Sequence, residues 1–231
     1  MGGYTCRLLY LALLLFFTCT FNAAGEDSSD FEWKVGDIWL IKAVYHSDLD
    51  EDKWSPPLLW EYKVAGLTLH ENENCYLVEV RRHNRGKEPC ARLLYRQSGR
   101  SLASVEIIKT RRNIKTSRVI NYNKGVPVQT EQSLIPFDTP VFPLVPGLSV
   151  DYRVRKKVTE SLYASKRIKQ TVSRAGRMDD NLIGLEIDAD LIEVKCISEN
   201  GSTFFTQYWD TNRPWPLYGE NSNMKYWLVK D

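Results

Sequence analysis

The chain has 231 residues, 31 basic and 29 acidic side chains and a formal net charge of +2. With 43% hydrophobic residues, this balance excludes a highly charged disordered chain and indicates a globular protein that buries a core. No apolar run reaches the roughly 20 residues of a transmembrane helix, so the sequence predicts no membrane-spanning segment in the mature chain.

The first residues have the layout of a secretory signal peptide. Arg7 precedes the apolar run Leu8 to Phe17, and small residues follow up to Gly25. We therefore predict that residues 1–25 are a signal peptide and that the mature chain is exported, either to the periplasm or outside the cell. Cys19 resembles the lipid-attachment cysteine of bacterial lipoproteins, but bulky residues precede it. Ordinary cleavage is therefore favoured over lipid anchoring.

From Asp37 onward the hydrophobic period is two, and β-branched and aromatic residues recur between turn clusters. The pattern predicts an all-β fold: one large, curved antiparallel meander, a half-barrel or open barrel, formed by a single domain over residues 26–231. The expected strands are 38–45, 59–69, 75–82, 90–96, 101–110, 115–122, 126–133, 148–160, 167–174, 191–198, 203–209 and 225–229.

Turn residues divide these strands. Asn123-Lys124-Gly125, Glu199-Asn200-Gly201 and Arg85-Gly86 each stand between two strand-like runs at hairpin spacing. The stretch 134–147 holds four prolines, which cannot donate hydrogen bonds to a sheet. We expect an irregular crossing there, between two parts of one sheet.

A weak internal repeat agrees with that division. Phe31–Trp39 and Phe142–Val150 both run in the order aromatic residue, spacer, glycine, strand. This order predicts two similar halves, each launched by a glycine in a turn conformation, Gly36 in one and Gly147 in the other.

An odd number of cysteines follows the signal peptide, which leaves at least one thiol unpaired in an exported chain. They are Cys75, Cys90 and Cys196. Matching the apolar positions of strands 75–82 and 90–96 places Tyr76 opposite Tyr95 and Cys75 opposite Arg96. The sulfurs of Cys75 and Cys90 would then lie roughly 20 Å apart, too far for a disulfide.

No motif indicates catalysis or metal binding. The histidines, at 46, 70 and 83, are widely separated, and there is no zinc spacing, phosphate-binding loop or nucleophile elbow. The acidic run Asp48–Asp52 fails as an EF-hand because Lys53 and Leu59 stand where glycine and glutamate are needed. It is expected to be a solvated acidic turn. The sequence therefore predicts a protein that is not an enzyme and has no cofactor.

The charges are segregated along the chain. Arg81–Arg118 holds 12 basic and 2 acidic residues, and Arg153–Arg177 holds 9 basic and 1 acidic. One interpretation is contact with an anionic surface such as lipid head groups. The other, which is favoured, is cross-strand pairing with acidic neighbours. Export and the lack of a known motif argue against nucleic-acid binding. The candidate contact residues are Arg92, Arg96, Arg111, Arg112 and Arg155.

The C-terminal run Trp209-Asp210-Thr211-Asn212-Arg213-Pro214-Trp215-Pro216-Leu217-Tyr218-Gly219 resembles a motif of an uncharacterised family of exported bacterial β-rich proteins. The entry Val35–Trp39 is similar to that family as well. The resemblance implies membership and carries no activity with it. More distantly, the long meander resembles the half-barrel lipoprotein carriers of the periplasm, in which a curved sheet wraps an apolar cavity, although their covering helices are not evident here.

That architecture implies binding of a lipid or another hydrophobic ligand. Six aromatic residues are candidates for lining such a cavity: Trp39, Trp60, Tyr62, Trp209, Trp215 and Trp227. The alternative, which is favoured for these rings, is that they fill a large β core. The alternative function is an envelope structural or interaction module that pairs with a protein partner through an exposed sheet edge.

Overall fold

The computed structural model describes residues 32–47, 50–84, 88–112, 114–122, 134–137, 142–157, 163–181 and 184–229. Within this part, 13 strands form one antiparallel sheet, and the short 3-10 helix Ser98–Arg100 is the sole helical element. The strands are β1 (Ile38–Ser47), β2 (Asp50–Trp54), β3 (Leu58–His70), β4 (Glu73–Arg82), β5 (Ala91–Arg96), β6 (Leu102–Arg111), β7 (Ile114–Asn121), β8 (Ser149–Lys157), β9 (Tyr163–Asp180), β10 (Leu185–Ser198), β11 (Thr203–Trp209), β12 (Tyr218–Asn221) and β13 (Met224–Leu228).

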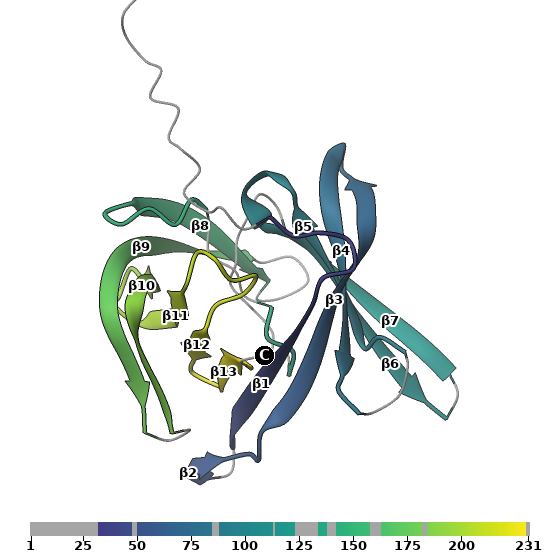
Figure 1. Ribbon diagram of the computed structural model, residues 1–231. Coiled ribbons are helices and arrows are strands. Elements are labelled where there is room, and N and C mark those ends of the chain that lie inside the picture. Colours follow the sequence, from purple (N-terminus) through teal and green to yellow (C-terminus); the bar gives the residue numbers. More distant parts are fainter. Residues whose placement is uncertain are drawn as a thin grey trace, which may run out of the picture.

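The sheet is a curved meander that does not close into a barrel. Its order is β7-β6-β5-β4-β3-β1-β13-β12-β11-β10-β9-β8, with β2 paired to β1 outside this path. The first long strand therefore pairs with the last one, and β7 and β8 lie at the two ends. Figure 1 shows β3 to β7 on one side and the strongly curved β8 to β11 on the other. The predicted all-β fold class is confirmed.

The two halves repeat one another. In the first half, the Gly36 amide donates to the Val64 carbonyl over 2.8 Å; in the second, the Gly147 amide donates to the Val172 carbonyl over 2.8 Å. Both glycines have positive φ, +102° and +90°, a region that glycine adopts at little cost. The predicted glycine turns thus launch β1 and β8 in the same way.

The equivalence extends across each half through one row of directly paired residues. In the first half the row is Val64, Val78, Leu93, Val105 and Ile120. In the second half it is Val172, Val194, Gln207, Gly219 and Tyr226. Since each row starts at the valine that accepts from the turn glycine, β3 to β7 correspond to β9 to β13 in order.

The predicted register between β4 and β5 is confirmed. Tyr76 pairs with Tyr95 and Cys75 pairs with Arg96. Cys75, Cys90 and Cys196 are free thiols. The turn Glu199-Asn200-Gly201 is confirmed as well, because Gly201 has φ +82° and connects β10 to β11.

Other elements differ from the sequence-based expectation. Of the expected acidic turn Asp48–Asp52, residues 50–52 belong to β2 and residues 48–49 lie outside the described residues. The Trp54 ring, also on β2, packs edge-on against His46 with centroids 5.2 Å apart. The short strand β12 was not expected, since its four residues follow a proline-rich stretch. The strand expected at 126–133 and the turns expected at 85–86 and 123–125 lie outside the described residues.

The largest core cluster draws on both halves of the chain. Trp33, Trp39, Tyr62 and Tyr95 of the first half surround Trp215, which is fully buried and precedes β12. The Trp215 ring lies 5.2 Å from the Tyr62 ring and 5.7 Å from the Trp39 ring, centroid to centroid. This contact, together with the β1–β13 pairing, joins the halves.

A segment of the proline-rich crossing packs onto this cluster. We call residues Leu134–Phe137 the strap. Within it, Ile135 is 6% exposed and Phe137 is 1% exposed. The hydroxyls of three core tyrosines donate to strap carbonyls: Tyr45 to Leu134, Tyr62 to Pro136 and Tyr95 to Phe137. The strap is therefore held through its backbone as well as by its buried side chains.

Candidate functional site

Most of the candidate aromatic residues lie in packed core. Trp39, Tyr62, Trp209 and Trp215 are all at most 4% exposed, and their neighbours are other side chains of this chain. Trp39 stacks on Tyr62 with centroids 5.6 Å apart, and Phe142 meets Trp209 edge-on at 5.6 Å. At these four positions the rings fill the core.

The remaining two aromatic candidates lie elsewhere. Trp227 is half-buried and packs against a separate small cluster that contains Tyr218. Trp60, on β3, contributes to the wall of a pocket. The six residues are therefore not brought together around this pocket, and Trp60 is the one among them that lines it.

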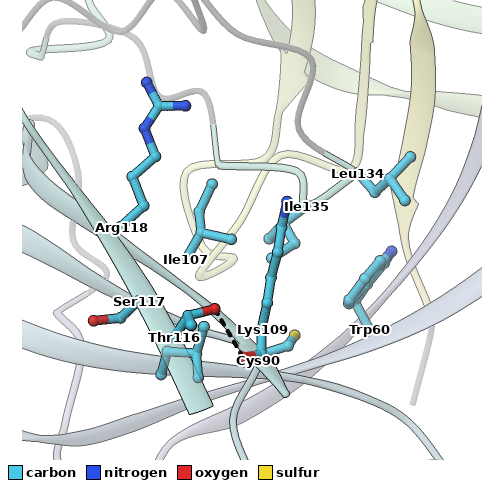
Figure 2. A pocket seen from close by; sticks show the side chains of 10 residues that line it. Trp60, Cys90, Ile107, Lys109, Thr116, Ser117, Arg118, Leu134 and Ile135 are labelled. Carbon is cyan, nitrogen blue, oxygen red and sulfur yellow. Dashed lines mark hydrogen bonds between the residues drawn. The ribbon is translucent and has the colours of Figure 1, made fainter. Parts of the chain in front are cut away.

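The pocket has a volume of about 450 Å³ and lies between the β6–β7 hairpin and the strap. Its lining residues are Trp60, Cys90, Ile107, Ile108, Lys109, Thr116, Ser117, Arg118, Leu134 and Ile135. Figure 2 shows Trp60 and Arg118 on opposite sides, with Ile107 and Lys109 between them.

The strand register explains which side chains meet in this pocket. Ile107 pairs with Arg118, and Lys109 pairs with Thr116. Directly opposed residues of antiparallel strands project to the same face, so these four residues share one face of the hairpin. The pairing of β6 with β7 is uninterrupted there. The Thr116 hydroxyl also donates to the Lys109 carbonyl over 3.3 Å.

The wall opposite Arg118 is held in place by hydrogen bonds. The indole N–H of Trp60 donates to the Tyr45 hydroxyl over 2.7 Å, and that hydroxyl donates in turn to the Leu134 carbonyl. Burial raises the pKa of Tyr45 above its usual value, so the hydroxyl stays protonated and remains a donor. The chain Trp60–Tyr45–Leu134 thus ties the strap to the pocket wall.

Cys90 completes this side of the pocket. Its thiol lies 3.2 Å from the Val80 carbonyl, and burial raises the pKa of the thiol. A thiol with a raised pKa is a weak nucleophile at neutral pH, so Cys90 contributes a small apolar surface rather than a reactive group.

Part of the floor of the pocket, including Lys109 and Thr116, belongs to a part of the sheet that the second half lacks. By the row of paired residues, the pair Ile107–Arg118 corresponds to the pair Asn221–Met224. The second-half hairpin turns directly after that pair. The first-half hairpin instead continues for four more pairs, to Arg111–Ile114. The pocket therefore lies at an addition to the repeated architecture.

Two of the candidate arginines act within the sheet. Arg92 lies 3.4 Å from both Glu79 and Glu106, its partners on the flanking strands. Arg96 is 6% exposed, forms an ion pair with Glu73 and donates to the Leu102 carbonyl over 3.1 Å. Both follow the cross-strand pairing that was the favoured interpretation.

The other three arginines are dispersed. Arg111 and Arg112 are exposed at the tip of the β6–β7 hairpin. Arg155 is on β8, at the opposite end of the sheet, and its side chain is outside what the structure describes. The two basic segments thus lie toward the two ends of the sheet, not on one continuous strand set.

Among the residues that the structure describes, no group of three or more His, Cys, Asp and Glu side chains is placed to hold a metal ion. In the same residues, no helix has the length and apolar character needed to cross a membrane. Comparison of the chain with protein-family models, curated protein sequences and solved structures yields no match. The site must therefore be interpreted from this chain's own residues.

Lys109, Arg118 and the strap are not among the residues predicted from the sequence to form a site. One signal was present for the two cations. Lys109 follows Val105 and Ile107 at intervals of two residues, and Arg118 stands two residues before Ile120, so both cations are on the same strand face as these inward-facing residues. A charged residue in the inward phase of an amphipathic strand breaks the pattern. No comparable signal marks the strap, because its position depends on contacts with distant strands.

Proposed function

We propose that this protein is an exported, non-enzymatic binding protein that holds an apolar ligand between the β6–β7 hairpin and the strap. The observation that carries the proposal is the pocket of about 450 Å³ with Trp60, Ile107 and Ile135 in its wall. Pockets for small ligands typically measure about 300–1,000 Å³ and are lined mainly by apolar side chains with a few polar groups.

Two further features support this location. Trp215 and the strap pack on the aromatic face, and the pocket lies between the strap and the β6–β7 hairpin. The β6–β7 hairpin, which forms the floor, is longer than its counterpart in the second half, the β12–β13 hairpin. The shared core does not require this extension, so a separate role for it is reasonable.

The direct test is to purify the mature chain from its native source, extract it with organic solvent and analyse the extract by mass spectrometry. We expect a stoichiometric apolar molecule. Ile107→Trp should fill the pocket, so the apolar molecule should no longer be recovered with the protein. The matched control is Val119→Trp, which adds the same bulk at a 57% exposed position on the other face of the hairpin. A clean extract from the wild-type protein would count against the proposal.

A second candidate function is a protein-interaction module. Among the described strands, β7 and β8 each have a paired neighbour on one side only, and unpaired edges are templates for strand addition. Crosslinking in the native envelope fraction would test this. Recovery of a defined partner that is crosslinked to β7 or β8 would favour the module, and recovery of monomer alone would count against it.

A further inference from the structure

We propose that the ligand of this pocket is an anionic amphiphile. Its negative group, a phosphate or a carboxylate, is bound by Lys109 and Arg118, and its tail packs against Trp60, Ile107 and Ile135. This inference rests on the proposed function, because it names the chemical class of the molecule that the pocket holds.

The two cations lie close together on one face of the β6–β7 hairpin. Lys109 pairs with Thr116, and Arg118 is two residues beyond Thr116 on the same strand face. The two residues are therefore diagonal neighbours, about 7–8 Å apart, a separation that long side chains can bridge. An anion between them can accept hydrogen bonds from both the ammonium and the guanidinium groups.

The described lining of the pocket is cationic. Among the lining residues that the structure describes, Lys109 and Arg118 are cations and none is aspartate or glutamate. Arg92 lies on the neighbouring strand β5, where it is matched to Glu79 and Glu106. The described lining thus combines cationic side chains with an apolar wall, which is the complement of a molecule with a negative head and an apolar tail.

The residue type changes along β6. Val105 and Ile107 are apolar residues of the inward face, and Ile107 also lines the pocket; the next position on that face is Lys109. In the second half, the equivalent hairpin ends at Asn221 and Met224, so it has no position that corresponds to Lys109. Lys109 therefore belongs to the extension of the first-half hairpin, whereas Arg118 lies in the last pair that the two hairpins share.

The experiment compares four amphiphiles with one tail: dodecyl phosphate, dodecanoate, dodecanol and dodecyltrimethylammonium. Each is titrated into the full mature chain, freed of bound lipid, below its micelle concentration and followed by calorimetry. Because hydrogen bonds to charged groups are strong, we expect at least one anionic amphiphile to bind about tenfold or more tightly than dodecanol. The phosphate and carboxylate arms distinguish the two head groups.

Variants then assign the preference to residues. Lys109→Gln should weaken binding of the anion about tenfold and leave dodecanol unchanged, and Lys109→Glu should reverse the preference toward dodecyltrimethylammonium. The matched control is Lys115→Gln, since Lys115 lies on the same hairpin but faces away and pairs with Glu88 at 3.2 Å. Lys109 is exposed, so its variants are expected to fold. The affinity of Arg118→Gln for the amphiphiles is interpreted only if the circular dichroism spectrum of this variant matches that of the wild type.

The outcomes separate the two proposals. Equal affinity for the anionic, neutral and cationic amphiphiles would overturn the anionic head group and leave the apolar pocket standing. Binding of none of the four, dodecanol included, would overturn the proposed function itself. An anion preference that Lys109→Gln and Lys115→Gln reduce equally would show a general charge effect and would also overturn the assignment to Lys109.

Discussion

At Gly219, the ring of Tyr226 lies directly on the backbone of β12. A methyl group at this position would overlap the ring, and the ring is 1% exposed, with its hydroxyl accepting from Gln207 over 2.7 Å. We predict that Gly219→Ala lowers the free energy of unfolding by about 2 kcal/mol or more, because overpacking forces the ring or the strand to move. Urea denaturation measures this change.

The control for that prediction is Gly176→Ala on β9. An added methyl there meets nothing within 4 Å, and Gly176 has no positive φ. Its effect should stay within about 0.5 kcal/mol, as for ordinary surface substitutions. Equal stability of the two variants would show that the Tyr226 ring moves aside without cost.

The strap is held to the core by hydrogen bonds from tyrosine hydroxyls. Tyr62 is fully buried and donates to the Pro136 carbonyl, and burial raises its pKa well above the usual value. Tyr62→Phe leaves that carbonyl without its donor. We therefore predict a loss of about 1–3 kcal/mol at pH 8, the typical penalty for an unsatisfied buried group. Chemical denaturation of the variant and the wild type gives the difference.

The raised pKa of Tyr62 makes its contribution to the free energy of unfolding depend on pH. Its folded-state pKa is raised, so its contribution is fully present below the unfolded value of about 10 and declines as the pH rises above it. The stability difference between wild type and Tyr62→Phe should hence be constant from pH 7 to 9. It should then shrink by about 1.4 kcal/mol per pH unit above 10. A difference that stays constant up to pH 11 would contradict the raised pKa.

For the whole molecule, the question is whether the two repeated halves unfold together. Trp215 of the second half is fully buried among aromatic rings of the first, and the Trp33 indole donates to the Pro214 carbonyl over 3.0 Å. β1 and β13 also pair along five residues. We predict one cooperative unfolding transition. The amides of β4 and of β10 should therefore lose their protection from hydrogen exchange at the same urea concentration.

Trp215→Ala provides the perturbation for this test. Removal of a buried tryptophan typically costs about 3–5 kcal/mol, and the loss should destabilise both halves because the side chain belongs to their common core. Two separate midpoints in the wild-type protein, or a Trp215→Ala variant in which only β8 to β13 are destabilised, would show that the halves are independent.

The strands themselves were predictable because their signals are local. Alternation of apolar and polar residues depends on neighbours two positions apart, and the turn glycines depend on their own φ, so β3 to β7 and the Tyr76–Tyr95 register follow from short stretches. β2 and β12 were not predicted from the sequence, because strands of five and four residues contain too few alternations of apolar and polar residues. The identity of Lys109 and Arg118 as pocket residues required the pairing of β6 with β7 and the location of the strap.

The sequence by itself determined the all-β class, most hairpins, the β4–β5 register and the glycine turns of the two halves, because each of these depends on contacts close along the chain. The tertiary structure alone decided that β1 pairs with β13, that Trp215 and the strap fill the aromatic face, and that a pocket remains beside Lys109 and Arg118. These features join residues far apart in the chain, and their energy comes from packing and burial that no local pattern records.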